Sequence, residues 1–141
     1  MNKYGAKKTT RKIGQNTYTF DSKAEADYFD LLYYRAASGE IRGLSLQPSF
    51  QIATAYKIDS NGKKKRVQAM RYTPDFKYKE KGKWVVVEVK GVKTEAYNIR
   101  KKLFLAQAKR QHNIDVFIEV VKGKETIYRC DTVNEVKDGV L

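Results

Sequence analysis

The feature that most constrains the fold is the apolar run Trp84-Val-Val-Val-Glu88-Val-Lys90. A continuous, valine-rich run of this length predicts a strand that is covered on both faces. Side chains alternate across a strand, so Glu88 and Lys90 project from the same face, about 6.5 Å apart at about 3.3 Å per residue. The two charges therefore indicate either a solvated strand end, where they pair with each other, or a site that needs charge at the end of a buried strand.

Two helices are expected beside this strand. Ser22, with Glu25 three residues later, forms a capping box that predicts a helix running to Ala37. Thr94 is suited to cap a second helix over residues 94–112. The side of the second helix that we expect to face the core contains Ile99, Leu103 and Ala106.

The remaining elements are expected to be strands. Asn61-Gly62 favours a tight hairpin turn, and Lys63, Lys64, Lys65 and Arg66 crowd its tip. The predicted strands cover residues 44–58, 66–79, 84–90, 114–121 and 126–130. The resulting order, α, β, β, β, α, β, β, predicts an α/β (α+β) fold with a mixed sheet flanked by helices.

The charge of the chain indicates a polyanionic partner. Twenty-nine Lys and Arg against sixteen Asp and Glu give a net charge of +13, which creates a strongly positive field. An anionic membrane is the weaker candidate, because the chain has neither a long apolar window nor a basic helix with a wide apolar face. We therefore expect nucleic acid as the partner and no membrane association.

The length of 141 residues fits one domain. Residues 1–14 are basic with little to bury, which predicts a flexible arm that either lies along phosphates or only keeps the protein soluble. Residues 15–141 are expected to form the single domain. The basic N-terminus is not followed by an apolar segment of the signal-peptide kind, so we expect a cytoplasmic protein.

Two further carboxylates can join Glu88. Asp75 follows Pro74, which marks an edge or break in a strand, and a hairpin through residues 80–82 would bring Asp75 near Glu88. Glu25 lies at the start of the core-facing stripe of the first helix. Each also has a structural explanation, since Asp75 can form a turn and Glu25 can complete the capping box.

Carboxylates this close repel each other, by roughly 4 kcal/mol at about 4 Å and an effective dielectric of 20, so such a site needs a cation or raised pKa values. Cys130 is the only cysteine, and no Cys and His cluster has zinc spacing, so a metal here would take oxygen ligands. Mg²⁺, with Mn²⁺ as a substitute, suits a few carboxylate ligands.

Pro74-Asp75, followed by Glu88-Val89-Lys90 and preceded by the helical glutamate of FDSKAEADYF, resembles the PD-(D/E)XK nuclease superfamily. The segments FDSKAEADYFDLL, YTPDF and VEVKGVKTEAYNIRKKLF together resemble a small family encoded by phages and prophages, generally described as nuclease-like or Holliday-junction-resolvase-like. The resemblance covers roughly residues 15–121. It implies a restriction-endonuclease-like αβββαβ core and, for a phage-encoded protein, the cytoplasm of the host.

The resemblance also implies roles for the site residues. Asp75 and Glu88 correspond to metal-binding carboxylates, the Val89 carbonyl is a further candidate ligand, and Glu25 corresponds to the helix-borne acidic residue that binds a metal directly or through water. Lys90 corresponds to the lysine of the motif. Glu88 stands where many members of the phage family carry aspartate, a change that the superfamily pattern accommodates.

The implied function is Mg²⁺-dependent, structure-selective hydrolysis of DNA phosphodiester bonds by an endonuclease, as in a phage Holliday junction resolvase acting in recombination. Symmetric cutting of a branched DNA implies a homodimer. A nuclease acting on linear, single-stranded or specific-sequence DNA and a DNA-binding protein without catalysis are the alternatives. The residues expected to contact DNA are Lys7, Lys8, Arg11, Lys12, Lys63, Lys64, Lys65, Arg66, Lys93, Arg100, Lys101 and Lys102.

Overall fold

The structure, a computed structural model, describes residues 7–137. Its centre is a five-stranded sheet with the strand order β11-β10-β9-β8-β3. These strands are β3 (Arg42–Leu46), β8 (Phe76–Glu80), β9 (Lys83–Lys90), β10 (Val116–Val121) and β11 (Lys124–Arg129). β9 pairs parallel with β10 and antiparallel with β8, so the sheet is mixed and the valine-rich run occupies its middle, as predicted.

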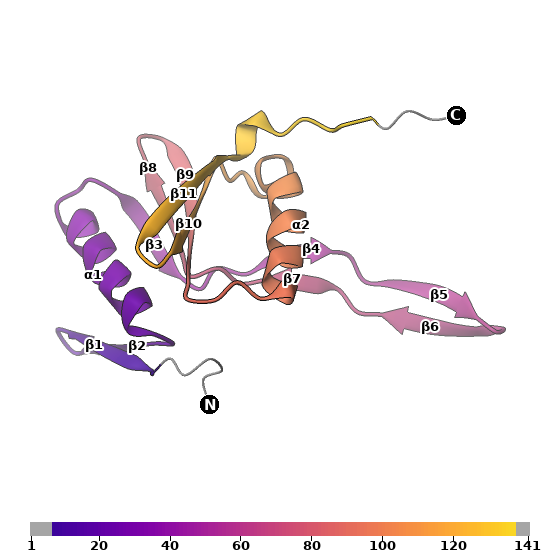
Figure 1. Cartoon of the computed structure of the whole chain (residues 1–141), viewed down its shortest axis with the longest axis horizontal. Helices are drawn as coiled ribbons and strands as arrows, with labels where there is room; N and C mark the ends of the chain where they lie inside the picture. The colour runs from indigo at the N-terminus through magenta and orange to yellow at the C-terminus, as the bar shows by residue number, and fades with distance from the viewer. Residues whose placement is uncertain (1–6, 138–141) are drawn as a thin grey trace.

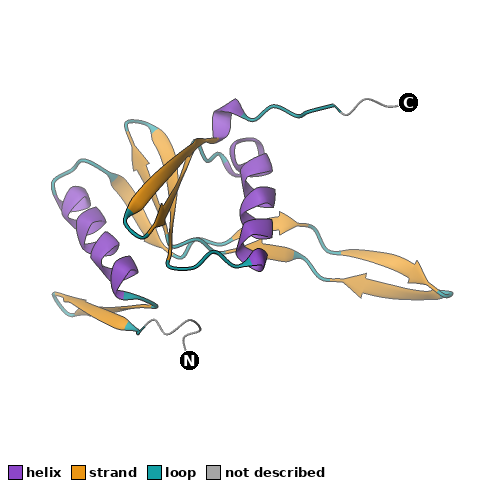
Figure 2. Ribbon diagram, in the orientation of Figure 1, coloured by secondary structure: helices purple, strands orange, loops and turns teal. Residues whose placement is uncertain are grey.

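Two helices, α1 (Lys23–Ala37) and α2 (Glu95–His112), lie on opposite sides of the sheet (Figures 1 and 2). Val85 and Val87 belong to the core cluster that contains residues of α1, whereas Val86 belongs to the cluster that contains residues of α2. The strand is therefore buried on both faces, which explains why its sequence is continuously apolar instead of alternating. The predicted α/β (α+β) class is confirmed.

Both predicted helix starts are confirmed. The Ser22 Oγ accepts a hydrogen bond from the Glu25 N–H at 3.1 Å, and the Thr94 Oγ1 accepts one from the Tyr97 N–H at 3.1 Å. Each bond satisfies one of the backbone donors that the first turn of a helix leaves without an intrahelical partner. The capping residues therefore fix where α1 and α2 begin, and with them the positions of Glu25 and Tyr97.

The predicted inner side of α2 is wrong at Ile99 and Ala106, whereas Leu103 packs against the core cluster on this side of the sheet. The buried residues of this helix are Tyr97, Phe104 and Ala108, whereas Ile99 is 48% exposed. Phe104 packs against Phe50, with 5.0 Å between the ring centroids. Large aromatic side chains bury more area than Ile99 can, so they determine which side of this polar helix faces the sheet.

The two long strands predicted at residues 44–58 and 66–79 are each divided into three. Besides β3 and β8, these segments contribute β4 (Phe50–Ala53), β5 (Tyr56–Ser60), β6 (Lys63–Val67) and β7 (Met70–Tyr72). The first break falls at Gln47-Pro48, where Gln47 has a φ of 50° and Pro48 has no N–H to donate. Another falls at Pro74, between β7 and β8.

The short strands form two separate two-stranded ribbons. β4 pairs antiparallel with β7 beside α2, and β5 pairs antiparallel with β6 beyond it. The turn of the second ribbon is the predicted Asn61-Gly62, with φ values of 53° and 78°. In Figure 1 the β5–β6 hairpin projects away from the rest of the molecule along its longest axis.

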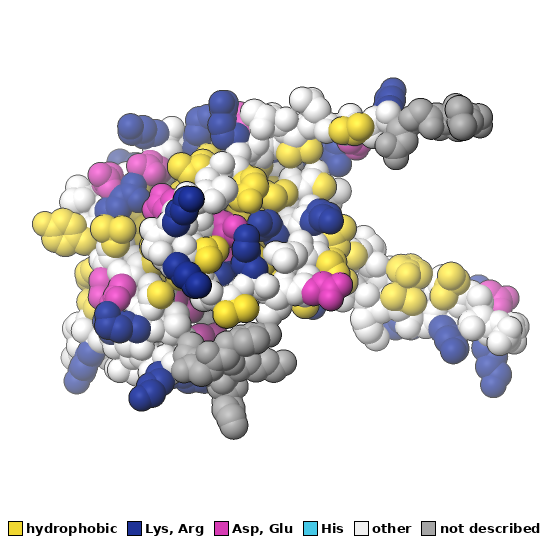
Figure 3. All heavy atoms as spheres, viewed as in Figure 1, with side chains coloured by type: hydrophobic (Ala, Val, Ile, Leu, Met, Phe, Trp, Pro, Cys, Tyr) yellow, Lys and Arg dark blue, Asp and Glu magenta, His cyan; other side chains and the backbone are white. Residues whose placement is uncertain are grey.

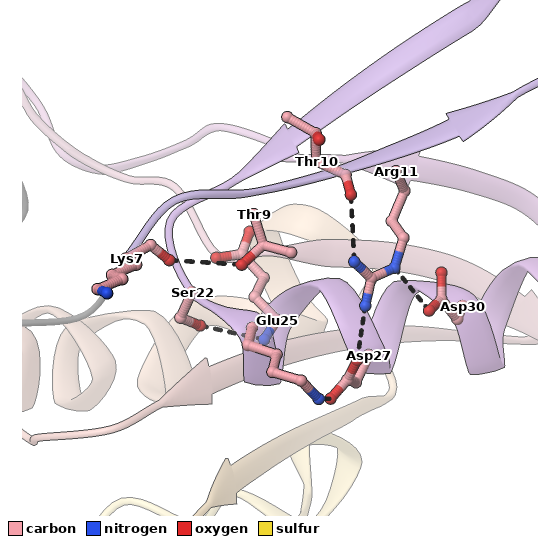
Figure 4. A network of polar contacts seen from close by, with 9 residues as sticks. Lys7, Thr9, Thr10, Arg11, Ser22, Glu25, Asp27 and Asp30 are labelled. Carbon is pink, nitrogen blue, oxygen red and sulfur yellow. Dashed lines mark hydrogen bonds and ion pairs between the residues drawn. The ribbon is translucent and has the colours of Figure 1, made fainter.

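The prediction of a flexible arm over residues 1–14 is wrong for residues 9–13, which form a strand. β1 (Thr9–Ile13) pairs antiparallel with β2 (Asn16–Phe20), and the hairpin leads directly into α1. Arg11 anchors it, because its guanidinium bonds Asp27 at 2.6 Å and Asp30 at 2.8 Å on α1 (Figure 4). Residues 1–6 of the predicted arm lie outside the described residues. No helix among residues 7–137 is long and apolar enough to cross a membrane.

Candidate active site

Asp75 is fixed at the point where β8 begins beside β9. Its backbone N–H donates to the Val87 carbonyl at 3.1 Å, and its carbonyl accepts from the Gln47 N–H at 2.8 Å. Its carboxyl Oδ2 accepts from the Val89 N–H at 2.7 Å. The hairpin between β8 and β9 thus brings Asp75 to the Glu88 end of β9, as the sequence predicted.

Glu88 is buried, with 4% of its surface exposed. Its Oε1 accepts a hydrogen bond of 2.6 Å from the hydroxyl of Tyr72, the last residue of β7. Its carboxyl is also in hydrogen-bond contact with Asp75. The reading of Glu88 as part of a solvated strand end is therefore wrong, because this carboxylate is enclosed by protein.

Glu25 reaches the same place from the other side of the sheet. It is 5% exposed, and its carboxyl is in hydrogen-bond contact with Asp75. Alternation along β9 directs Glu88 toward the side of the sheet covered by α2, whereas Glu25 comes from α1. The carboxyls of Glu25, Asp75 and Glu88, hereafter the carboxylate cluster, thus form a chain with Asp75 in the middle.

The cluster holds protons more tightly than ordinary carboxyls. Burial, then repulsion from Asp75 and Asp21, raises the pKa of Glu25 to about 8. Burial and the neighbouring Glu88 raise the pKa of Asp75 well above its ordinary value. Burial also raises the pKa of Glu88, but its hydrogen bonds from Asp75 and Tyr72 and the charge of Lys90 oppose that rise. Asp75 and Glu88 therefore titrate as a pair rather than as two independent carboxyls.

Lys90 lies next to the cluster and packs on an aromatic ring. Its Nζ is 4.8 Å from the centroid of the Tyr97 ring, a cation–π distance. The Tyr97 hydroxyl donates to Glu119 Oε2 at 2.6 Å, and Lys101 Nζ donates to the same oxygen at 3.0 Å. Although burial opposes its ionisation, the bonds from Tyr97 and Lys101 lower the pKa of Glu119. Glu119 is thus a charged anchor for the ring that supports Lys90.

A cleft opens beside the carboxylate cluster. Its volume is about 210 Å³, and Glu25 and Asp75 contribute to its wall. The other lining residues are Thr17, Tyr18, Thr19 and Phe20 of β2, with Leu46 and Gln47 at the end of β3. The β1–β2 hairpin, which the sequence did not predict, therefore forms one side of the approach to the cluster.

The fit of a metal can be judged from these donors. No group of three or more His, Cys, Asp and Glu side chains within residues 7–137 is arranged to hold a metal ion. The chemistry of the cluster nevertheless suits a hard divalent cation, because neighbouring carboxylates with raised pKa values gain by exchanging protons for such an ion. Asp75 is the shared member, since it contacts both Glu25 and Glu88.

The basic residues predicted to contact DNA differ in how free their charges are. Arg11 bonds Asp27 and Asp30, and Lys101 bonds Glu119, so part of their charge is neutralised within the protein. Lys93 Nζ is 3.8 Å from Glu119. Arg100 is half-buried and its Nε donates to the Arg71 carbonyl. The exposed members are Lys7, Lys8, Lys12, Lys63, Lys64, Lys65, Arg66, Lys93 and Lys102.

The supporting roles of three residues were not predicted from the sequence. Tyr72 binds Glu88, Tyr97 packs on Lys90, and Glu119 binds Tyr97. Glu119 stands opposite Glu88 in the parallel register of β9 and β10. A glutamate inside the apolar strand VFIEVV is the signal that could have revealed it, because a buried carboxylate needs partners.

Comparison with known proteins places the chain in a family. No curated protein matches it. A solved structure described as "Crystal structure of SSO0001" is similar, with 16% sequence identity and a TM-score of 0.33. That similarity covers 79% of this chain and 51% of the other, so the chain spans about half the length of this solved relative. A family described as "Protein of unknown function (DUF1064)" has a model that matches residues 1–129, and the chain therefore belongs to the DUF1064 family.

Proposed function

We propose that this protein is a divalent-metal-dependent DNA endonuclease that uses Mg²⁺, or Mn²⁺ in its place. The observation that carries the proposal is the carboxylate cluster at the end of the central strand, with Lys90 beside it. Burial and mutual repulsion raise the pKa of all three carboxyls, and such perturbed groups gather at sites of chemistry. The net charge of +13 supports DNA as the substrate.

The chain's own groups have separate tasks in this mechanism. Asp75 and Glu88 would hold the metal, with Glu25 and the Val89 carbonyl as further ligands directly or through water. A metal bound there would make water more acidic and stabilise charge on the phosphate. Tyr72 keeps Glu88 in place through its 2.6 Å hydrogen bond. Lys90, supported by the Tyr97 ring, is positioned to orient the attacking water or to neutralise the scissile phosphate.

Within this class we favour a structure-selective enzyme, a Holliday junction resolvase that acts as a homodimer. The resemblance of YTPDF and VEVKG to the phage family supports that choice. Two equal sites related by a twofold axis would let a dimer cut opposite strands of a junction symmetrically. A nuclease of linear, single-stranded or specific-sequence DNA would use the same cluster, so the substrate decides between them.

A DNA-binding protein without catalysis is the second candidate. It is favoured by one observation: the acidic side chains of the described residues are not arranged around a metal position. In that protein Asp75 and Glu88 would share a proton and only support the end of the sheet. The two candidates differ in whether a divalent cation changes the cluster.

The test compares cutting with and without metal. Purified protein would be incubated with labelled four-way junction, linear duplex and single-stranded DNA in Mg²⁺, in Mn²⁺ and in EDTA. Glu88→Gln removes one of the three carboxyls of the cluster, and Glu125→Gln on β11 is the matched exposed control. Paired cuts of the junction that disappear in EDTA and in Glu88→Gln, but persist in Glu125→Gln, would support a resolvase. Equal cutting of all three DNAs would support a general nuclease, and binding without cutting would support the second candidate.

A further inference from the structure

The β5–β6 hairpin, hereafter the hairpin arm, is built without a core. None of the residues in strands Tyr56–Ser60 and Lys63–Val67 is buried. An isolated two-stranded hairpin is only marginally stable in water. Its turn is well formed, because Asn61 and Gly62 both have positive φ and the Asp59 Oδ1 accepts from the Gly62 N–H at 2.8 Å. The shape of the arm is thus set by its turn and ladder rather than by packing.

Repulsion between positive charges opposes the stability of the arm. Lys57 stands directly opposite Arg66 in the antiparallel register, and like charges at that position repel each other. Lys63, Lys64 and Lys65 follow on the same strand, with Asp59 as the only acidic residue of the hairpin. Asp59, which stands opposite Lys64, can balance only one of the five Lys and Arg side chains of the arm. This excess of positive charge is the arrangement expected of a surface whose neutralising charge comes from a polyanion.

The two faces of the arm differ. Alternation places Lys57, Asp59, Lys64 and Arg66 on one face, and Tyr56, Ile58, Lys63 and Lys65 on the other. Tyr56 is 55% exposed and Ile58 53% exposed. Figure 3 shows hydrophobic side chains on the part of the arm that is closer to the body of the protein, and Lys or Arg side chains toward its tip. One face therefore carries Lys57, Lys64 and Arg66 with a single carboxylate, Asp59, and the other combines cations with apolar groups.

The arm is joined directly to the candidate active site. β6 continues into β7, whose last residue, Tyr72, donates to Glu88 at 2.6 Å. The partner strand β5 follows β4, which pairs with β7. Asn61 at the tip and Tyr72 are eleven residues apart, so their Cα atoms lie at most about 36 Å apart at about 3.3 Å per residue. That reach is about one turn of B-form DNA, roughly 34–36 Å.

We propose that the hairpin arm lies in the major groove of duplex DNA, within about one helical turn of the phosphodiester bond held at the carboxylate cluster. The major groove of B-DNA, about 12 Å wide, admits a two-stranded β-ribbon, whereas the major groove of A-form RNA is too narrow for side chains to read. Lys and Arg on both faces would meet the phosphates that border the groove, and Tyr56 and Ile58 would face the bases. The inference rests on the proposed function for the position of the cut, but the binding itself requires no cutting.

The main test measures binding in EDTA, so that no DNA is cut. The arm variant Lys63→Gln/Lys64→Gln/Lys65→Gln loses three charges at the tip. The matched control Lys81→Gln/Lys122→Gln/Lys124→Gln loses three exposed charges at the turns β8–β9 and β10–β11. Affinity for a 30-base-pair duplex would be measured from about 50 to 200 mM salt, a range over which phosphate contacts weaken steeply.

The arm variant should bind at least about 10-fold more weakly, and the slope of log affinity against log salt should fall by about 0.9 for each lost phosphate contact. The control should change the affinity less than about 3-fold, because screening limits exposed charges that make no contact. Equal losses in both variants would overturn the proposal, since they would mean that only net charge matters. Circular dichroism of each variant would confirm that the fold is retained.

Substrate length provides the second test. Shortening the duplex from 30 to about 8 base pairs should weaken binding by the wild-type protein and leave the affinity of the arm variant almost unchanged, because the groove about one turn away is lost. Equal sensitivity of the two proteins would contradict the proposal. The double variant Tyr56→Ser/Ile58→Ser would be examined by sedimentation. If these substitutions convert a dimer to a monomer, the apolar face of the arm contacts a second copy of the chain, and the groove proposal is overturned.

The outcome of these tests is separate from that of the endonuclease test. Glu88→Gln, measured in EDTA, should lose affinity for the long duplex when Lys63, Lys64 and Lys65 are also changed, as the wild-type protein does, because it keeps the arm intact. A protein that shows arm-dependent binding but never cuts DNA would retain the groove contact and lose the proposed activity. A protein that cuts DNA with an affinity independent of the arm would retain the activity and lose the groove contact.

Discussion

The carboxylate cluster and the hairpin arm are two charged regions that the fold treats in opposite ways. In the cluster Glu25 and Glu88 are 5% and 4% exposed, and hydrogen bonds from Tyr72 and from the Val89 N–H hold Glu88 and Asp75. In the arm no strand residue is buried, and Lys57 stands opposite Arg66. Burial makes charge costly and sensitive to each neighbour, whereas water screens the charges of the arm. Substitutions in the cluster should therefore change the protein itself, and substitutions in the arm should change only its partner binding.

The largest effect is expected from Asp75→Asn, because Asp75 contacts both other carboxyls of the cluster. The change keeps the shape of the side chain but removes its charge, and should lower the rate of metal-dependent cutting by about 10³-fold or more. Single-turnover cleavage at saturating DNA would measure it. Affinity for uncut duplex in EDTA should not fall, and a parallel loss of binding would show that the two regions are not separable.

The second effect is a pH dependence of stability that Glu25 produces. Its pKa is raised to about 8, so between its ordinary value and pH 8 the folded protein binds more protons than the unfolded chain. Stability should therefore fall as pH rises, by about 3 kcal/mol between pH 5 and pH 7.5 for this group alone. Urea unfolding across that range should show a smaller decline in Glu25→Gln.

The effect of a divalent cation on stability is a second measurement of the same carboxylates. If the ion exchanges for protons in the carboxylate cluster, Mg²⁺ or Mn²⁺ should restore stability at pH 7.5 by about 2.7 kcal/mol at a concentration 100 times the dissociation constant. The gain should be much smaller at pH 5, where protons compete with the ion. An unchanged Tm with either metal at both pH values would contradict a cation site.

The third effect concerns Tyr72→Phe, which deletes the hydroxyl that donates to Glu88 at 2.6 Å. A buried carboxylate left without this donor should cost about 1–3 kcal/mol in the free energy of unfolding at neutral pH. The hydroxyl also helps to hold down the pKa of Glu88, so its loss should shift the acidic limb of the cleavage profile to higher pH. Tyr34→Phe, on an exposed tyrosine of α1, is the control and should change neither quantity.

The sequence predicted the features of this site that depend on short stretches of chain. The valine-rich strand, the caps Ser22 and Thr94, and the Asn61-Gly62 turn each follow from a few neighbouring residues, and all are present in the structure. Asp75 was also placed correctly beside Glu88, because a single hairpin decides the pairing of β8 with β9. Local chemistry was sufficient in these cases.

What could not be predicted depends on contacts between distant segments. The supporting role of Tyr97 requires the register of β10 against β9, which places Glu119 beside Glu88, and the position of α2 above both strands. Arg11 looked like part of a basic arm because its partners Asp27 and Asp30 stand sixteen and nineteen residues later. Ion pairs and registers of this kind are decided by packing, which composition and periodicity do not contain.

The smallest effect on stability is expected for Ile58→Ser in the hairpin arm. The same substitution of a buried isoleucine in the core should lower the free energy of unfolding much more. Ile58 is 53% exposed, so the change should alter the free energy of unfolding by less than about 0.5 kcal/mol. Ile41→Ser, at a residue 2% exposed, should cost at least about 3 kcal/mol, because it leaves a cavity and buries a hydroxyl. Urea unfolding of both variants would measure the difference. A loss at Ile58 close to that at Ile41 would mean that the apolar face of the arm is covered in the free protein, and the arm would then not be available to a groove of DNA.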